Sequence, residues 1–171
     1  MAVPSFLNGS FRYLLLSGVV DVQTIMDSLH DELVDTALAW TQTLGVRGDT
    51  SQTFKSPVGA YGATAYFTVA LVRISATDLQ IIATDGYGLV INNETHQHLN
   101  VDALGTDVCL FTGAGKPFVV IAAQRAAPET WWCVEVDRYP DTTHPPMWVC
   151  SGGPRIAAGN ATTYNLADYA H

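Results

Sequence analysis

The sequence predicts an α+β fold, in which one N-terminal amphipathic helix packs on a mainly antiparallel β-sheet with meander or sandwich character. Apolar residues recur at three- and four-residue steps between Asp21 and Trp40, as expected for a helix buried on one side. Strand-length runs rich in aromatic and β-branched residues, separated by turn residues, then follow from about residue 61 to 137. Beyond Asp137, closely spaced prolines and glycines interrupt any regular element.

These observations divide the chain into two parts. We expect an α+β domain over residues 1–139, with a helix at about 21–40 and a sheet at about 61–137. We expect residues 140–171 to form an extended C-terminal arm that is ordered mainly by a neighbouring chain.

The helix has clear start signals and two distinct sides. Asp21 is a natural N-cap, and the apolar residues before and after it fit a hydrophobic staple. The stripe expected to be buried consists of Val22, Ile25, Met26, Leu29, Leu33, Ala37 and Trp40. The opposite edge carries Asp27, Asp31 and Asp35 at four-residue spacing. This acidic edge is either a solvated helix face or a docking edge for a basic partner.

The remaining elements follow from runs of apolar residues and turn signals. We expect residues 11–16 to form a short apolar strand. We expect residues 41–60 to form a loop with a brief strand at 53–55. We predict further strands over 66–74, 79–84, 89–92, 107–111, 118–124 and 131–136.

Composition indicates a protein that buries surface against other subunits. Hydrophobic residues make up 48% of the 171 residues and charged residues only 14%, against roughly 25% in an ordinary soluble domain. An oligomer explains a poorly charged surface, and a monomer coated with Thr, Ser, Asn and Gln is the alternative. The net charge of −8 leaves no visible basic patch, so we expect no direct nucleic-acid binding. The apolar runs are too short for a membrane span.

Cysteine usage predicts a reducing compartment. The three cysteines contain no CxxC pair, which disfavours both a zinc ribbon and a disulfide framework. The first residues lack the basic segment of a secretory signal, so we expect synthesis in a cytoplasm.

Three groups of residues are candidates for chemistry, and each departs from its motif. Gly113 to Lys116 resembles part of a phosphate loop, but Pro117 takes the hydroxyl position and Leu110 the first glycine. The pair His96 and His98 is half of a metal site, whose other half would have to come from His30, His144 or a distant carboxylate.

The third group lies near the start of the arm. Asp137, Asp141 and His144 precede Cys150 and Ser151, which are possible nucleophiles of a hydrolase. No GxSxG elbow surrounds Ser151, and carboxylates in a proline-rich segment are commonly turn residues. We therefore predict no catalytic, cofactor-binding or metal-binding residues and no enzymatic activity.

Aromatic residues near the end of the predicted sheet are the candidate interface. Trp131, Trp132, Trp148 and Tyr139 lie close in sequence, with carboxylates nearby. They fit core and subunit-interface positions, where tryptophan is favoured, and alternatively a sugar-stacking platform. Adjacent Trp131 and Trp132 fall on opposite sides of a strand, so only one of them can face a given ligand.

Three segments carry a resemblance to a known group of proteins. These are the opening FLNGSFRY of residues 6–13, the run FVVIAAQRAAPE of residues 118–129, and SGGPR of residues 151–155. In these segments, and in the order of its elements, the chain resembles small virion structural proteins of tailed bacteriophages. The resemblance spans most of the chain and leaves the position open between neck, tail, baseplate and head decoration.

The resemblance implies a non-enzymatic assembly subunit, usually in a ring or another symmetric array. We therefore expect a multi-copy ring component at the tail or head–tail junction, located in the virion and made in the host cytoplasm. Its partners would be copies of itself and other virion proteins, without cofactors. The alternative is a receptor- or carbohydrate-binding module of the particle that uses Trp131 or Trp132, Trp148 and Asp141. A metal-assisted hydrolase around His96, His98 and His144 is a third hypothesis.

Overall fold

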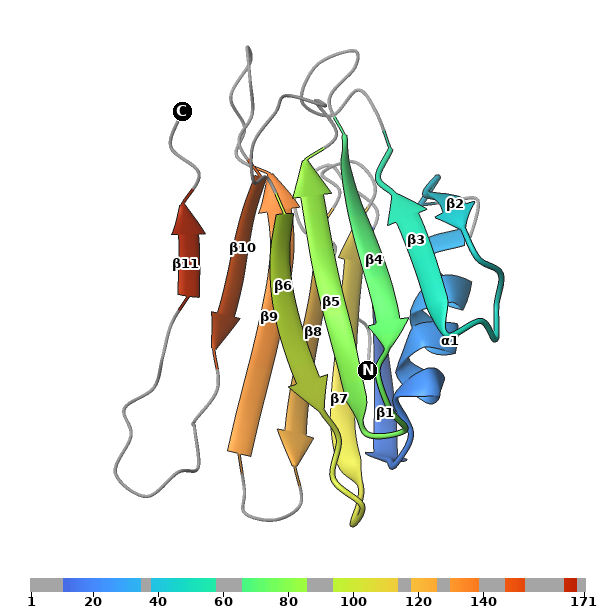
Figure 1. Cartoon of the computed structure of the whole chain (residues 1–171), viewed down its shortest axis with the longest axis vertical. Helices are drawn as coiled ribbons and strands as arrows, with labels where there is room; N and C mark the ends of the chain where they lie inside the picture. Colours follow the sequence, from blue (N-terminus) through green and yellow to red (C-terminus); the bar gives the residue numbers. More distant parts are fainter. Residues whose placement is uncertain are drawn as a thin grey trace.

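The fold consists of two antiparallel β-sheets and one helix, as Figure 1 shows for a computed structural model of the chain. The structure describes residues 11–34, 38–57, 66–85, 94–113, 118–125, 130–138, 147–152 and 165–168. The predicted class, α+β with mainly antiparallel sheet and an N-terminal helix, is confirmed. No helix of the described part is long and apolar enough to cross a membrane.

Sheet A contains six strands in the order β1-β7-β8-β9-β10-β11, and every neighbouring pair is antiparallel. After β1, its strands follow one another in sequence, so most of the sheet is a meander. The strands are β1 (Phe11–Val19), β7 (Thr106–Gly113), β8 (Val119–Arg125), β9 (Thr130–Arg138), β10 (Met147–Gly152) and β11 (Asn165–Asp168).

Sheet B is a meander of five consecutive strands, again antiparallel throughout. Its strands are β2 (Thr41–Leu44), β3 (Ser51–Lys55), β4 (Phe67–Arg73), β5 (Asp78–Asp85) and β6 (Glu94–Asn100). The chain therefore enters sheet A through β1, builds sheet B, and then completes sheet A.

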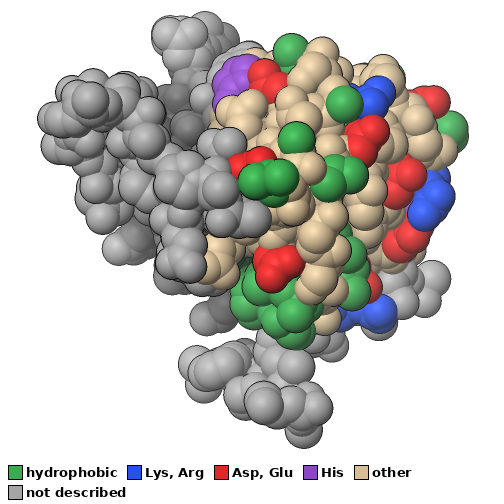
Figure 2. All heavy atoms as spheres, turned by 90° about the horizontal axis from the view of Figure 1, so that it is seen from below, with side chains coloured by type: hydrophobic (Ala, Val, Ile, Leu, Met, Phe, Trp, Pro, Cys, Tyr) green, Lys and Arg blue, Asp and Glu red, His purple; other side chains and the backbone are tan. Residues whose placement is uncertain are grey.

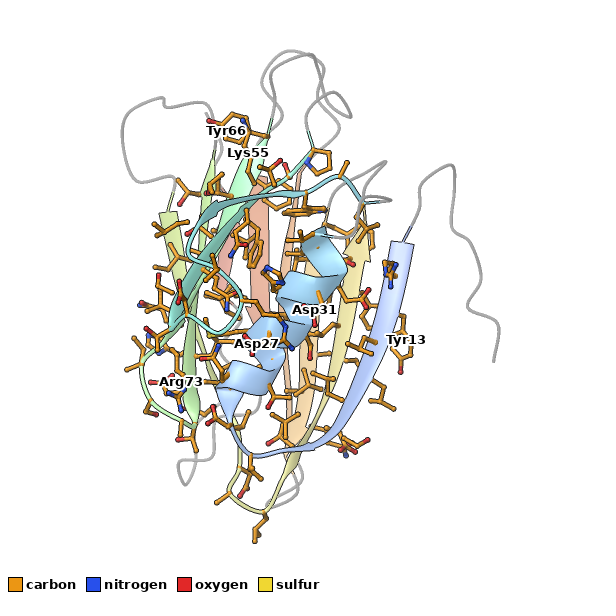
Figure 3. All side chains as sticks on the ribbon, turned by 90° about the vertical axis from the view of Figure 1, so that its right-hand side faces the viewer. Tyr13, Asp27, Asp31, Lys55, Tyr66 and Arg73 are labelled. Carbon is orange, nitrogen blue, oxygen red and sulfur yellow. The ribbon has the colours of Figure 1, made fainter. Side chains whose placement is uncertain are left out.

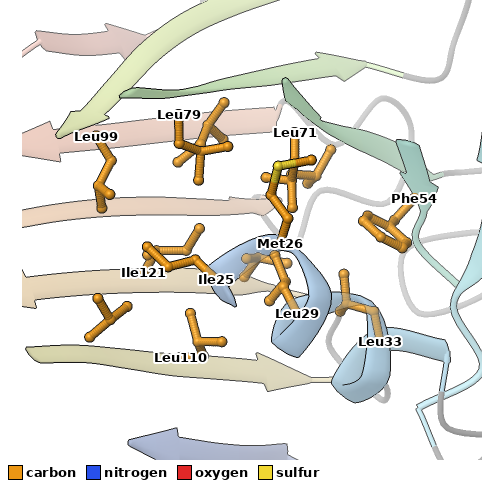
Figure 4. Close-up of a cluster of buried hydrophobic side chains, with 14 of the residues drawn as sticks. Ile25, Met26, Leu29, Leu33, Phe54, Leu71, Leu79, Leu99, Leu110 and Ile121 are labelled. Atoms are coloured by element: carbon orange, nitrogen blue, oxygen red, sulfur yellow. The ribbon is translucent and has the colours of Figure 1, made fainter. Parts of the chain in front are cut away.

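The helix α1 (Val22–Val34) lies between the two sheets and closes one side of the sandwich, as Figures 1 and 3 show. Its apolar stripe points into the space between the layers (Figure 4). There it meets alternate residues of strands from both sheets, as the period of two in a strand requires. The side chains at this centre are fully or almost fully buried: Ile25, Met26, Leu29, Leu33, Phe54, Leu71, Leu79, Leu99, Leu110 and Ile121.

The start of the helix is fixed by the predicted cap. The backbone N–H of Gln23 donates to Asp21 Oδ1 at 2.8 Å, which satisfies one of the free amides of the first turn. Arg73 Nη2 donates to the other carboxylate oxygen at 2.9 Å, so the cap also ties the helix to β4. The backbone N–H of Val22 donates to the Ala76 carbonyl at 2.8 Å, which adds the β4–β5 turn.

The helix ends earlier than the predicted Trp40. Residues 35–37 lie outside the described part, and Leu38 to Trp40 are not helical. Ala39 has a φ of 56°, a left-handed conformation that turns the chain toward β2. Trp40 is nevertheless buried, because its Nε1–H donates to the Gly113 carbonyl at 2.9 Å and its ring meets Phe67 edge-on. Helical periodicity alone does not distinguish this arrangement from a longer helix.

Three other regions contain more strand than predicted. One is β6, which follows the strand predicted over residues 89–92, and those four residues lie outside the described part. The expected loop over residues 41–60 contains both β2 and β3. The alternating pattern of β3 is not evident in the sequence, because the polar Gln52 occupies a fully buried position on its inner side. Within residues 140–171, where an extended arm is predicted, the structure describes β10 and β11 as strands of the chain's own sheet A. The sheets thus extend beyond residues 61–137 at both ends.

Truncating Leu29 tests the role of the helix stripe. Leu29→Ala leaves a cavity between the sheets at a fully buried position, so we expect a loss of about 2–5 kcal/mol in the free energy of unfolding. Urea denaturation measures this change. Leu104→Ala is the matched control, because Leu104 is 75% exposed and its truncation should change stability by less than about 0.5 kcal/mol. Equal losses in both variants would contradict this account of the core.

Candidate functional site

The outer face of sheet A is apolar over three neighbouring strands. The inward residues of β7 and β8 are buried and the inward Leu14 and Leu16 of β1 are half-buried, while the alternate residues point away from the core. We define the apolar face as Tyr13 and Leu15 of β1, Cys109 and Phe111 of β7, and Val120 and Ala122 of β8. They form two rows across the sheet, Tyr13–Phe111–Val120 and Leu15–Cys109–Ala122, because their Cα atoms are register partners.

Packing between strands holds the exposed part of the apolar face together. The rings of Tyr13 and Phe111 lie 4.9 Å apart at an angle of 44°, a favourable cross-strand aromatic pair. The Tyr13 hydroxyl lies 3.8 Å from Cys109 Sγ. This hydrogen bond, with a smaller effect of burial, raises the pKa of Tyr13 above its ordinary value. Leu15 is 50% exposed and Tyr13 40%, so about half of each side chain is available for contact.

The apolar face is also poor in charge. Among the described outward side chains of β1, β7 and β8, Asp107 is the one ionised group, and it accepts a hydrogen bond from the Gly18 N–H at 2.9 Å. Arg12 of β1 belongs to the inner side, where its guanidinium pairs with Glu32 of α1. In the end-on view of Figure 2, the largest gathering of apolar side chains lies on the side of the molecule formed by sheet A. Little desolvation of charge would oppose burial here.

The outer face of sheet B differs in character. Its outward positions combine polar side chains with apolar ones: Thr53, Thr68, Gln80 and Thr84 alternate with Ala70, Val72 and Ile82. At the β6 edge, His98 Nδ1 lies 3.0 Å from Asp78 Oδ1, so that a polar pair occupies this face. The outer face of sheet B is therefore mixed in character, whereas the apolar rows of sheet A favour an apolar partner.

The predicted aromatic interface is distributed along the strands rather than gathered. Trp131 and Trp132 lie in β9, opposite Gln124 and Ala123 of β8. Trp148 lies in β10, opposite Asp137. Asp137 is six residues along β9 from Trp131, which corresponds to about 20 Å of strand. The backbone thus does not bring Trp148 beside either of the other two tryptophans. Tyr139 and Asp141 lie outside the described residues.

The acidic edge of the helix binds a turn of the same chain. Asp31 accepts a hydrogen bond from Arg47 Nε at 3.0 Å, and Asp27 Oδ2 lies 3.6 Å from Arg47 Nη1. The backbone N–H of Gly48 also donates to Asp27 Oδ1 at 3.0 Å. Figure 3 shows Asp27 and Asp31 on the helix side that faces away from the core. These two carboxylates therefore fasten the β2–β3 turn to α1, while Asp35 lies outside the described residues.

Opposing effects set the pKa of Asp31. Partial burial acts to raise this pKa, but hydrogen bonds from Arg47 and His30, together with their charges, outweigh it and lower the pKa below its ordinary value. The same pairing raises the pKa of Arg47. His30 adds a second link, because its Nε2 lies 3.1 Å from Gln42 Oε1 of β2.

The histidine and nucleophile candidates are not brought into one site. His98 lies on β6 of sheet B, whereas Cys150 and Ser151 lie on β10 of sheet A. His144 lies outside the described residues, as does the side chain of His96. The described residues contain no group of three or more His, Cys, Asp or Glu side chains arranged to hold a metal ion. After Gly113 the chain continues into strand β8, so the Gly113 to Lys116 segment links two strands, as predicted.

The apolar face was not predicted from the sequence, and the predicted tryptophan interface stays a prediction. The run Tyr13 to Leu16 contained the signal, because it is apolar on both faces of a strand. Cys109, Phe111, Val120 and Ala122 repeat that signal on the neighbouring strands. What the sequence lacks is the register that places these residues side by side.

The Asp31–Arg47 pair makes a testable contribution to stability that depends on pH. Because folding lowers the pKa of Asp31, the pair stabilises the fold above the unfolded-state pKa of about 3.9, and this is lost as pH falls through the folded-state value. We expect Asp31→Asn to lower the urea midpoint at pH 7 and to have no effect once wild-type Asp31 is protonated. The loss should be smaller than for Leu29→Ala, because both partners are more than half exposed. In a double-mutant cycle, adding Arg47→Gln to Asp31→Asn should lower the free energy of unfolding only by the contribution of the remaining Arg47–Asp27 contact. A difference that is constant with pH would refute this assignment.

Comparison of the chain with protein-family models, with curated proteins and with solved structures finds no match.

Proposed function

We propose that this protein is a non-enzymatic structural subunit of a tailed-phage virion, a multi-copy component at the tail or head–tail junction that assembles through the apolar face of sheet A. The observation that carries the proposal is the pair of apolar rows on that face, with Tyr13 and Leu15 about half exposed. The proposal assigns no catalytic residue and no cofactor.

The apolar face has the properties of an interface core rather than of an ordinary surface. Single exposed apolar residues are normal and need no explanation. Here, aromatic and aliphatic side chains lie in adjacent rows over three strands, and the described charge, Asp107, is engaged with Gly18. Depletion of charge with enrichment of aromatic residues distinguishes the cores of protein interfaces. Burial of about half of a leucine against a partner contributes on the order of 1 kcal/mol.

Two features of the sequence support a place in a virion. Only 14% of the residues are charged, which fits a chain that buries surface on several sides. The segments at residues 6–13, 118–129 and 151–155 resemble small tailed-phage virion proteins, and the first two of them run into β1 and β8. The resembling segments thus overlap the strands that carry the apolar face.

Charge insertion tests whether the apolar face mediates assembly. We expect light scattering of the purified chain to give a multiple of the 18.4 kDa subunit mass. Leu15→Glu would place a charge in the centre of the contact and should shift the protein to the monomer across a concentration series. Leu104→Glu is the matched control, since it changes the same residue type at a more exposed position outside the apolar face, and it should leave the mass unchanged. Circular dichroism and urea midpoints would check that both variants fold.

Two results would end the proposal. One is a wild-type chain that stays monomeric at all concentrations and binds no other particle protein. The other is the absence of the chain from purified virions, measured by quantitative mass spectrometry. Loss of assembly in Leu104→Glu but not in Leu15→Glu would move the interface away from the apolar face.

A further inference from the structure

We propose that copies of this chain join edge to edge through sheet A, with β11 of one copy adding to β1 of the next. The inference rests on the proposed function, because it adds a second contact, along the sheet edge, to the contact through the apolar face. It names the two strands, their relative direction and their register.

Among the described strands, β1 is an edge of sheet A, and it carries few of the features that usually protect an edge. Edge strands present unpaired N–H and C=O groups, and proteins commonly protect them with charges, prolines or bulges. β1 has nine residues and contains no proline. Its one charged residue, Arg12, pairs with Glu32. The register shift is confined to Leu16–Val19, where Gly18 has a φ of 66°, so Phe11 to Leu16 remain a regular edge.

The directions of the two edge strands favour a head-to-tail contact. Because sheet A has six strands and all neighbours are antiparallel, β1 and β11 run in opposite directions. Copies related by rotation about an axis along the strands therefore place β11 antiparallel to the next β1, which continues the pattern of the sheet. A heterologous contact of this kind closes into a ring when the rotation divides a full turn.

The outline of the molecule distinguishes this contact from a two-fold pairing of β1 with β1. Figure 1 shows α1 and β2 extending outward beyond β1 on one side of the molecule. On the other side, sheet A extends past β6, the last strand of sheet B, so no described strand of sheet B covers β11. A two-fold pairing would bring two α1 helices into the same space. The head-to-tail contact instead places α1 and β2 over the uncovered β11 of the neighbour.

The register follows from one row of the sheet. Tyr13 is the partner of Phe111, and successive partners across the sheet are Val120, Glu135, Cys150 and Leu166. Paired residues share a face of the sheet, so Leu166 lies at a position of the same face as Tyr13. When the sheet continues from one copy to the next in this same row, Leu166 of one copy lies opposite Tyr13 of the next copy. The apolar faces of neighbouring copies would then lie on the same side of one continuous sheet.

Disulfide trapping tests this register directly. Paired residues of antiparallel strands have Cα atoms about 4.5–5.5 Å apart, which suits a disulfide. Within one copy, Tyr13 and Leu166 are separated by five strand spacings, about 24 Å, which is too far for a bond. In a background with Cys109, Cys133 and Cys150 replaced by alanine, we expect Tyr13→Cys and Leu166→Cys in one chain to give a ladder of covalent oligomers under mild oxidation. Peptide mapping should show the 13–166 bond.

Mixing single variants distinguishes the alternatives. Tyr13→Cys mixed with Leu166→Cys should give mixed dimers, at least tenfold more than either variant gives alone. The matched control mixes Leu14→Cys with Leu166→Cys. Leu14 lies on the opposite face of β1, so this mixture should form few disulfide-linked dimers. Disulfide-linked homodimers of Tyr13→Cys alone, or of Leu166→Cys alone, would indicate a two-fold contact and overturn the inference.

The failure of this inference can be told from failure of the proposed function. An oligomer by light scattering that never forms the 13–166 bond would overturn the edge contact and leave the assembly function intact. A wild-type chain that stays monomeric and binds no other particle protein would overturn both. Hydrogen exchange that protects both edges of β1 in the monomer would show that another segment of the same chain covers that edge.

Discussion

Burial of the α1 stripe between two sheets is the constraint on which the rest of the structure depends. Two sheets that stack face to face leave their sides open, and α1 closes the side next to β1 and β2. Leu29 and Leu33 are fully buried there and contribute apolar area to both layers. Polar contacts fix where the helix lies: Asp21 with Arg73 at its start, Glu32 with Arg12 of sheet A, and Asp31 with Arg47 of sheet B.

The placement of the helix also determines the character of the surface. Several of the few charged residues are engaged in holding α1 against its surroundings, including three of the eight basic ones, Arg12, Arg47 and Arg73. Because these groups lie on the inner or helical side, the outer side of β1, β7 and β8 carries mainly apolar side chains, with Asp107 as its one described ionised group. The composition contains unusually few charged residues. In three dimensions, the apolar side chains gather on one part of the surface. The proposed assembly and its edge contact both use this side of the molecule.

Sequence reasoning succeeded where local chemistry decides the structure and failed where distant residues do. The cap at Asp21 and the strands around Phe67 and Ile121 were predictable from local patterns. Strand β3 was mostly missed because Gln52 occupies a buried position. Its amide Nε2 donates to the Asp49 carbonyl at 3.2 Å, a contact that alternation of apolar residues does not reveal. The helix end was missed because Trp40 continues the apolar stripe while Ala39 turns the chain away.

The sequence by itself determined the α+β class, the start of the helix and the apolar positions of most strands, because turn residues and periodicity act over a few neighbouring residues. Only the tertiary structure decided that the carboxylates of the helix meet Arg47 and that Tyr13 lies beside Phe111, 98 residues further along the chain. Pairings at that separation depend on the register of whole strands, which no local stretch of sequence specifies. The candidate interface is a product of that register, and it therefore appeared only once the sheets were assembled.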